Sequence, residues 1–296
     1  MKRWSDDGAI ETQRTDGGHR RFHLRSVLEG ARERSIPTFL DPFSPWEANV
    51  WLAVEAAAGP EGFGRLINLG LAWLSSGDTE LLGRLLFEAG RREDIPFTRF
   101  LDEGVRGFMA SVGQEWLSGR LQVGEEHLAT QVVLESLLRL RIHRESAGLP
   151  ASGPVDPKPV AVAGSMEGDH HDLGAQAVRS VLEREGWKVY YLGPDVPVEE
   201  FAAVQRAQLA SLVCISFSPS NTLPDLQRAV KVLEEFYRPD LPYALALGGT
   251  VVDIGPEFTE GTVFEGLSFS RSAAEFQSWL RSHSRTRTSG EPVGVA

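Results

Sequence analysis

The spacing of apolar residues divides most of the chain into a helical half and a half in which strands and helices alternate. Between Trp46 and Arg144, apolar side chains recur every three or four positions, which is the spacing of helices that pack against one another. Polar or glycine-rich breaks interrupt the pattern near Gly59, Gly77, Asp94 and Gly119. Four or five helices are therefore predicted, and a bundle is the arrangement that buries their apolar faces.

The second half of the chain predicts a parallel sheet covered by helices. Short apolar runs near Val160, Val189, Leu212, Ala244 and Val263 alternate with segments of helical spacing. This alternation is typical of a sheet with helices on both faces. The stretch 145–159 contains four prolines and two glycines, so it is predicted to link the two halves.

The two ends of the chain have a different character from the middle. Residues 1–36 are polar with a turn-rich centre, and the last residues lack apolar periodicity, which is typical of disorder. The predicted organisation is an N-terminal unit at 1–36, a linker at 37–45, a helical bundle at 46–147, a linker at 148–158, an α/β unit at 159–283 and a disordered tail at 284–296.

Charge and cysteine content add two constraints. The formal net charge of the 296 residues is −11, which argues against nucleic acid, yet residues 1–36 hold eight Lys and Arg against six Asp and Glu. This asymmetry suits a small basic arm on an acidic body. The single cysteine, Cys214, excludes an intramolecular disulfide and is predicted to be buried in a strand. With neither a membrane-length apolar run nor a signal-peptide pattern, a cytoplasmic protein without a membrane partner is expected.

A polar loop after the first predicted strand carries the most specific chemistry. It holds Asp169, His171 and Gly174, between the apolar run 159–164 and a helical segment that opens at Ala175. Open α/β folds bind ligands at this edge, where the carboxyl ends of the strands meet the loops. Asp169 can hydrogen-bond one ring nitrogen of His171 and so raise the basicity of the other as a metal ligand. Gly174 lets a planar group approach the backbone closely.

The spacing Asp169-x-His171-x-x-Gly174 resembles the cobalamin-binding signature. The resemblance implies that His171 displaces the cofactor's own base and ligates cobalt from below, with His170 as the local competitor. Further segments follow in the family's order, namely Tyr191–Pro197 after the second strand, Ser216 after the third and Gly248-Gly249 after the fourth. In the resembled fold the glycine pair leaves room for the nucleotide tail and the serine hydrogen-bonds in the same cleft. Taken alone, a glycine pair is usually a turn.

A second group of residues, in the predicted bundle, resembles the helical cap of cobalamin-dependent transcriptional regulators. Trp116 is followed by Val123-x-x-Glu126-His127, with Gly119 between the two helices. In that family the cap covers the upper face of the cofactor, so Trp116, Val123, Glu126 and His127 are expected to contact an adenosyl group. The alternatives are an ordinary core position for the indole and a helix N-terminus for the carboxylate.

One position of the cap departs from the resembled family. Light-responsive members carry a histidine directly after this tryptophan, where the present chain has Leu117. A leucine side chain cannot ligate cobalt, which puts a stable bis-histidine state after illumination in doubt. The expected cofactor is adenosylcobalamin, with methylcobalamin as the alternative. Light, cobalamin level and redox state all stay open as the signal.

The basic N-terminal arm resembles the second half of a MerR-type winged helix-turn-helix. Trp4 would end the recognition helix, and Thr15–Gly18 would form the turn of the wing. DNA contacts are expected from Arg3, Arg14, His19, Arg20 and Arg21. Because the pattern lacks most of the recognition helix, we expect weak DNA binding and a native start upstream of Met1. The alternative is a solvated basic hairpin.

Together these features predict a multi-domain α and α/β protein. Its parts are a partial winged-helix remnant, a four-helix-bundle cap and a Rossmann-like (flavodoxin-like) cobalamin domain. The expected function is that of a cobalamin-binding transcriptional regulator, not an enzyme, in which the cofactor controls domain arrangement, oligomerisation and DNA binding. Its expected partners are operator DNA and further copies of the chain. The main alternative is a corrinoid methyl carrier of a cobalamin-dependent methyltransferase system, and a module that has lost its cofactor is a third interpretation.

Overall fold

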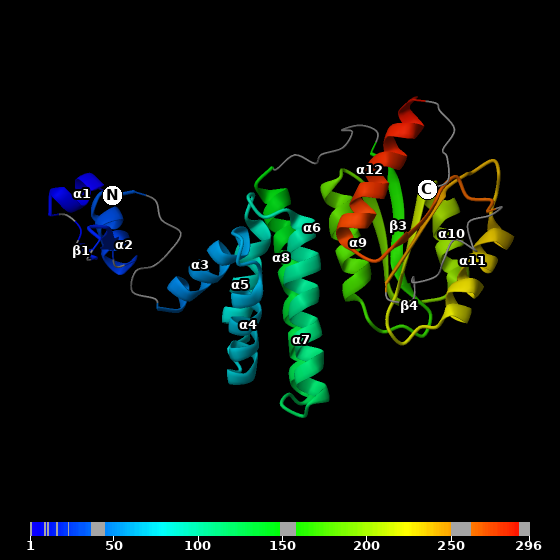
Figure 1. Ribbon diagram of the computed structural model, residues 1–296. Helices are drawn as coiled ribbons and strands as arrows, with labels where there is room; N and C mark the ends of the chain where they lie inside the picture. The colour runs from blue at the N-terminus through cyan, green and yellow to red at the C-terminus, as the bar shows by residue number, and fades with distance from the viewer. Residues whose placement is uncertain are drawn as a thin grey trace.

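An N-terminal unit, a helical unit and an α/β unit follow one another along the chain (Figure 1). The computed structural model describes residues 2–8, 10, 12–15, 17–22, 24–36, 45–148, 158–249 and 262–289. The linkers predicted at 37–45 and 148–158 lie almost entirely outside the described residues. Within the described ranges, every helix is too short or too polar to cross a bilayer.

The N-terminal unit consists of a helix, a two-stranded hairpin and a second helix. Its elements are α1 (Lys2–Asp6), β1 (Thr12–Arg14), β2 (Arg20–Phe22) and α2 (Leu24–Glu33). The two strands pair antiparallel. The hairpin closes at the predicted place, because the Thr15 N–H donates to the His19 carbonyl at 2.9 Å and the Gly18 N–H donates to the Thr15 carbonyl at 2.8 Å.

The helical unit contains the predicted breaks and one irregular turn. Its elements are α3 (Pro45–Ala58), α4 (Gly64–Ser76), α5 (Thr79–Arg91), α6 (Phe97–Arg99), the π-helical turn η1 (Phe100–Val105), α7 (Arg106–Leu117) and α8 (Val123–Ser146). Elements α6, η1 and α7 follow one another without interruption. Gly77, at φ +80°, ends α4 in the left-handed conformation that glycine adopts most easily. Buried leucine and phenylalanine side chains, such as Leu66, Leu82, Phe100 and Phe108, form the core of this unit.

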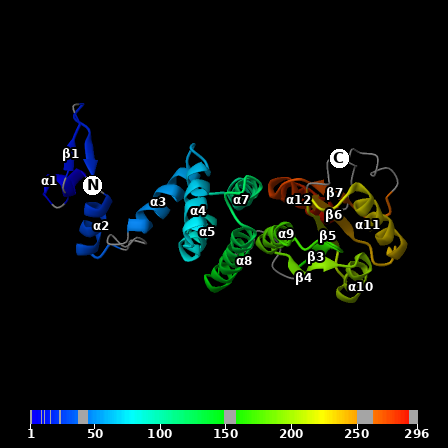
Figure 2. The same cartoon turned by 90° about the horizontal axis from the view of Figure 1, so that it is seen from below.

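The α/β unit is a five-stranded parallel sheet with helices on both faces. Its elements are β3 (Val160–Met166), α9 (Leu173–Arg184), β4 (Lys188–Val196), α10 (Val198–Gln208), β5 (Leu212–Phe217), α11 (Leu223–Phe236), β6 (Ala244–Gly249), β7 (Leu267–Ser270) and α12 (Ala273–Ser289). The strand order β4-β3-β5-β6-β7 is the flavodoxin-like order. Helices α9 and α12 cover the face toward the helical unit, and α10 and α11 cover the other (Figure 2).

The two faces of this sheet differ in side-chain size. The face toward α9 and the helical unit carries small residues, among them Ala161, Ala163, Cys214 and Ala246. The opposite face carries larger ones, among them Val162, Val213, Ile215, Leu245 and Leu247. Small and larger residues alternate along each strand, and successive side chains point to opposite faces, which produces this difference. Space for a ligand is therefore available on the side toward the helical unit.

The helical unit and the α/β unit contact each other through α8, α9 and the segment Phe97–Arg106. Arg184 of α9 lies over the ring of Phe97, with 3.5 Å between its Cζ and the ring centroid. Burial, aided by nearby Arg144, lowers the pKa of the Arg184 guanidinium to about 10. Arg141 of α8 lies 3.6 Å from a carboxylate oxygen of Glu183 on α9. Packing and charge therefore both join the two units.

Several boundaries differ from the sequence-based prediction. The segments expected just after strands lie within them: 191–196 in β4, Ser216 in β5 and Gly248-Gly249 in β6. The last strand begins at Leu267, whereas the apolar run near Val263 predicted an earlier start. Phe264 is nevertheless buried, so this run contributes a loop residue to the core instead of a strand. Helix α12 continues to Ser289, so residues 284–289, which were predicted to be disordered, are helical. Between Ala273 and Gly290 the sequence contains no glycine or proline, which is the physical reason why this helix can extend.

Candidate functional site

The loop between β3 and α9 presents a histidine backed by a buried carboxylate. Asp169 is completely buried, and its Oδ1 lies 3.2 Å from Nδ1 of His171 and accepts the His171 N–H at 2.9 Å. The His171 side chain itself is 68% exposed. Because Nδ1 faces the carboxylate, Nε2 on the other edge of the ring points away from it. This is the arrangement in which a carboxylate orients an imidazole as a metal ligand.

Neighbouring strands hold this loop in place. The Ser218 N–H, just beyond β5, donates to Oδ2 of Asp169 at 2.8 Å. The Ser165 hydroxyl, on β3, donates to the carbonyl of His171 at 2.9 Å. Both oxygens of the buried carboxylate therefore have donors, which a buried charge requires. His170, the alternative ligand, is exposed.

A second carboxyl group next to the histidine is held by a tyrosine. The Tyr191 hydroxyl, on β4, donates to Oδ1 of Asp172, and Gln176 donates to its Oδ2 at 3.1 Å. Burial raises the pKa of the Asp172 carboxyl; the negative charge of Asp169 acts in the same direction, and the bond from Gln176 opposes them. The start of α9 is thereby fixed to β4.

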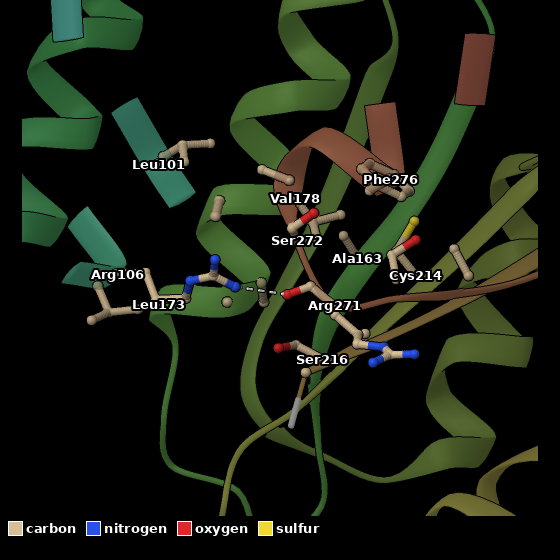
Figure 3. Close-up of a pocket in the computed structure, with 18 of the residues that line it drawn as sticks. Leu101, Arg106, Ala163, Leu173, Val178, Cys214, Ser216, Arg271, Ser272 and Phe276 are labelled. Atoms are coloured by element: carbon tan, nitrogen blue, oxygen red, sulfur yellow. Dashed lines mark hydrogen bonds between the residues drawn. The ribbon is translucent and has the colours of Figure 1, made fainter. Parts of the chain in front are cut away.

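A cavity of about 480 Å³ lies beside this loop, between the sheet, α9, α12 and the helical unit. Most of its wall is apolar or glycine. The lining includes four of the predicted positions, Gly174, Ser216, Gly248 and Gly249. Figure 3 shows Leu101 and Arg106 of the helical unit facing Ala163, Cys214 and Ser216 of the sheet. The predicted tail-binding residues therefore surround one space.

The glycines of this cavity are also required by close packing. A Cβ atom at Gly174 would lie 2.4 Å from Oγ of Ser216, and one at Gly249, where φ is +117°, would lie 1.8 Å from the Phe217 carbonyl oxygen. At Gly248 the nearest atom would be the Ser270 carbonyl oxygen at 3.1 Å. Larger residues at these positions would displace the strands or fill the cavity. The explanation of the glycine pair as a simple turn is thus incomplete, because both residues belong to β6.

The predicted cap residues lie around the turn between α7 and α8. Trp116 is 45% exposed and Val123 54% exposed. His127 and Glu126 contact each other, with 3.0 Å between Nδ1 and Oε2. Glu125 forms a capping box with Gln122 at the start of α8, so Glu125, rather than Glu126, serves the helix N-terminus in this way. These cap residues are absent from the cavity lining described above. A core position for the indole, the alternative considered from sequence, does not match its exposure.

The structure adds a polar contact, made of three hydrogen bonds, that the sequence did not suggest. The carboxylate of Asp102, in η1, accepts the N–H groups of Ala273 and Ala274 at 2.8 and 3.0 Å. Arg106 donates to the carbonyl of Arg271 at 3.0 Å (Figure 3). All five residues except Ala274 line the cavity. We call this contact the η1–α12 bridge, because it joins the helical unit to the start of α12 across the cavity wall.

The basic residues of the N-terminal unit do not lie on a single face. Arg14 pairs opposite Arg20 in the hairpin, whereas Arg21 is the next residue along β2 and points to the other face. Arg20 is bound to Asp6 at 2.5 Å, while Arg14, His19 and Arg21 are exposed. The side chain of Arg3 lies outside what the structure describes. Arg14 and Arg20 therefore share one face of the hairpin, and Arg21 lies on the other.

Two family models match parts of the α/β unit and of the helical unit. A family model described as a B12 binding domain matches residues 159–269, and a second B12 binding domain model matches residues 71–141. B12-binding domains are thus present in the α/β unit and in the helical unit. The predicted cobalamin or corrinoid cofactor is supported, and its particular form is left open.

Relatives from two functional groups match the chain. Dimethylamine corrinoid protein 3 of Methanosarcina acetivorans is 28% identical over 144 residues, which cover 49% of this chain and 65% of that protein. The HTH-type transcriptional repressor CarA of Myxococcus xanthus is 27% identical over 202 residues, which cover 60% of this chain and 64% of that protein. The chain therefore spans a little less than two thirds of the length of these relatives.

Among solved structures, the monomethylamine corrinoid protein of Methanosarcina barkeri has a similar fold. The TM-score is 0.53 at 16% identity, and the match covers 73% of this chain and 95% of that one. At this identity the likeness establishes the fold of the helical and α/β units. The residues described above fit a cobalamin, because an exposed imidazole backed by a buried carboxylate lies next to a glycine-lined cavity.

Proposed function

We propose that this chain is a cobalamin-dependent transcriptional regulator that is not itself an enzyme. The observation that carries this proposal is the helix–hairpin–helix unit at residues 2–33, which precedes the B12 binding domains and exposes Arg14 and Arg21. The similarity to the CarA repressor supports it. The unit would correspond to the second half of a MerR-type winged helix, and its exposed arginines would contact phosphates.

In this proposal His171 would hold the cobalt of cobalamin through Nε2. Asp169 holds Nδ1, and the cavity lined by Gly174, Ser216 and the pair Gly248-Gly249 accepts the nucleotide tail. When bound, cobalamin supplies a cobalt–carbon bond that light or chemical change can break. Trp116 and the Glu126–His127 pair of the cap would contact the upper ligand. Adenosylcobalamin is the proposed form.

The proposed regulation is a shift between two arrangements of the helical unit and the α/β unit. The η1–α12 bridge lies on the cavity wall, so any group that fills the cavity changes the surroundings of Asp102 and Arg106. A cofactor can shift the arrangement only by as much as its affinity for the two arrangements differs. Changes in domain arrangement, and the oligomerisation that we propose to accompany them, would then alter DNA affinity.

DNA binding by the full chain tests the proposal directly. Fluorescence anisotropy would be measured with a random duplex and with the duplex upstream of the chain's own gene, with and without adenosylcobalamin, in darkness and after green light. In the variant Arg14→Ala, we expect the slope of log affinity against log salt to fall by roughly 1, because one phosphate contact is lost. Arg238→Ala, which removes an exposed arginine from the α/β unit, is the matched control. Affinity that is independent of the cofactor would contradict the proposal.

The second candidate function is that of a corrinoid methyl carrier. It is favoured by the similarity to the dimethylamine corrinoid protein and by the fold shared with the monomethylamine corrinoid protein. In that case the same lower site would hold the corrinoid, and the cap would admit a methyltransferase partner. Transfer of the methyl group from bound methylcobalamin to an added thiol only when a corrinoid methyltransferase is also present, without any DNA binding, would favour this candidate.

A further inference from the structure

Asp195, at the end of β4, has an unusual backbone conformation. Its φ is +56°, and among the described residues only Ser35 and Leu209 share a positive φ without being glycine. Side chains with a Cβ atom avoid this left-handed region, although aspartate enters it more readily because its carboxylate can bond nearby backbone. A residue stays in such a conformation where its surroundings fix it, and such residues cluster at functional sites.

Asp195 is fixed by the loop between β3 and α9 that carries His171, which we call the histidine loop. Its carboxylate Oδ1 accepts the N–H of Gly168 at 2.8 Å, and its own N–H donates to the carbonyl of Asp169 at 2.9 Å. One residue of β4 is thus bonded to two consecutive residues just before His170 and His171. Both bonds depend on the left-handed turn, since it directs the backbone N–H and the carboxylate of Asp195 to the same segment.

These two bonds complete the support of Asp169. The Asp169 N–H donates to the Met166 carbonyl at 2.9 Å, and its carboxylate accepts Ser218 from the β5 side. Asp195 holds the Asp169 carbonyl from the β4 side. Without the bonds from Asp195, the segment 167–169 could move relative to β4 while the Asp169 carboxylate stayed attached to Ser218 beyond β5. That movement would change the angle between the Asp169 carboxylate and the imidazole of His171.

We infer that Asp195 is a positioning residue for the lower cobalt ligand. It keeps the Asp169 carboxylate against Nδ1 of His171, so that Nε2 stays directed away from the loop and ready to bind. It acts through Gly168 and Asp169 and does not itself contact the imidazole. This role rests on the proposed cobalamin-binding function and goes beyond it, because it assigns a specific task to the left-handed residue near the end of β4.

Three substitutions separate the acceptor oxygen of the Asp195 side chain from the left-handed conformation of its backbone. Asp195→Asn keeps an oxygen acceptor and a side chain that tolerates the left-handed region. Asp195→Gly keeps the backbone conformation and loses the acceptor, and Asp195→Ala loses both. Asp240→Ala is the matched control, because it removes an exposed carboxylate that bonds Arg238 in another loop of the same unit.

The readouts are the affinity for adenosylcobalamin and the absorbance spectrum of the bound form. We expect Asp195→Asn to resemble the wild type, and Asp195→Gly and Asp195→Ala to bind about tenfold more weakly, the lower end of the effect of losing an outer-shell partner of a metal ligand. Part of the bound cofactor in these two variants should show a spectrum without histidine coordination. Wild-type spectra for Asp195→Gly and Asp195→Ala would overturn the inference, as would failure of Asp195→Asn to rescue.

A measurement without the cofactor separates this inference from the proposed function. In the cofactor-free protein, the Gly168 amide should exchange with solvent faster in Asp195→Gly and Asp195→Ala, and the ring resonances of His171 should shift. Thermal unfolding checks that the α/β unit remains folded. If wild type does not bind cobalamin but these signals change, the loop is positioned as inferred and the cofactor proposal fails. If the signals stay as in wild type, the positioning role itself is wrong.

Discussion

The two sides of the proposed cobalamin site are built in different ways. On the lower side, Asp169 is fully buried, and its carboxylate is bonded to both Ser218 and His171. On the upper side, Trp116 and Leu117 are 45% and 78% exposed at the end of α7. A polar group whose bonds are all made needs little reorganisation when a ligand arrives, whereas exposed apolar groups gain mainly by becoming covered. We therefore expect the lower side to provide most of the affinity for the cofactor, and the upper side to discriminate between different upper ligands.

The largest effect should come from removing the lower ligand itself. For His171→Ala we expect the affinity for cobalamin to fall by at least the roughly 10–100-fold that loss of an outer-shell partner costs, because the cobalt ligand is lost outright. The spectrum of histidine coordination should disappear in an absorbance titration. His170→Ala, at the exposed neighbouring position, is the control. If His170→Ala loses the signal and His171→Ala keeps it, the lower side has been assigned to the wrong residue.

The second effect tests whether the cavity takes part in binding. Gly174→Ala places a Cβ atom 2.4 Å from Oγ of Ser216, so we expect about 1–3 kcal/mol of destabilisation from overpacking in addition to weaker binding. Ser216→Ala removes the clashing oxygen. The double variant should therefore regain most of its thermal stability, and alanine in α9 is favourable by about 1 kcal/mol over glycine. Binding should stay weaker than in wild type, and full recovery of binding would show that the cavity does not hold the tail.

The lower side was largely predictable from sequence because its interactions are local. Asp169 and His171 are two residues apart, on a loop whose position follows from the apolar run before it and the helix after it. The parallel arrangement that brings Ser216 and Gly248 to the same edge follows from the alternation of strands and helices. The left-handed conformation of Asp195 and its bonds to the histidine loop left no sign in the pattern.

The contact between the two units was not predictable in the same way. Asp102 bonds the start of α12 from a distant part of the sequence. On a regular helix, Asp102 and Arg106 would be predicted to form an ordinary exposed pair four residues apart. The π-helical turn at Phe100–Val105 changes the register of the helix there, and such turns often occur at functional sites. Nothing in the apolar spacing marks this turn.

A smaller effect is expected from breaking the η1–α12 bridge. Asp102→Ala removes the acceptor for the N–H groups of Ala273 and Ala274. Because the contact is partly exposed, we expect the free energy of opening this contact to fall by about 1.5 kcal/mol, the low end for hydrogen bonds to a charged group. Hydrogen exchange at these two amides measures it. Glu103→Ala, whose carboxylate bonds Arg99 within the helical unit, is the control. Unchanged exchange in Asp102→Ala would mean that the bridge does not hold the two units together.

Leu117→His should have the smallest effect on adenosylcobalamin binding in darkness, and it is the sharpest test of the upper side. Leu117 is 78% exposed, so the substitution should change the free energy of unfolding by less than about 0.5 kcal/mol. It places an imidazole directly after Trp116, at the position where the sequence resemblance implies a histidine in light-responsive regulators. With adenosylcobalamin, we expect a dark spectrum like that of wild type and, after green light, a lasting spectrum of coordination by two histidines. Leu117→Gln is the control, since it adds a polar side chain without an imidazole. If Leu117→His gains no lasting photoproduct, the end of α7 does not face the upper ligand, and the division of roles between the two sides would have to be abandoned.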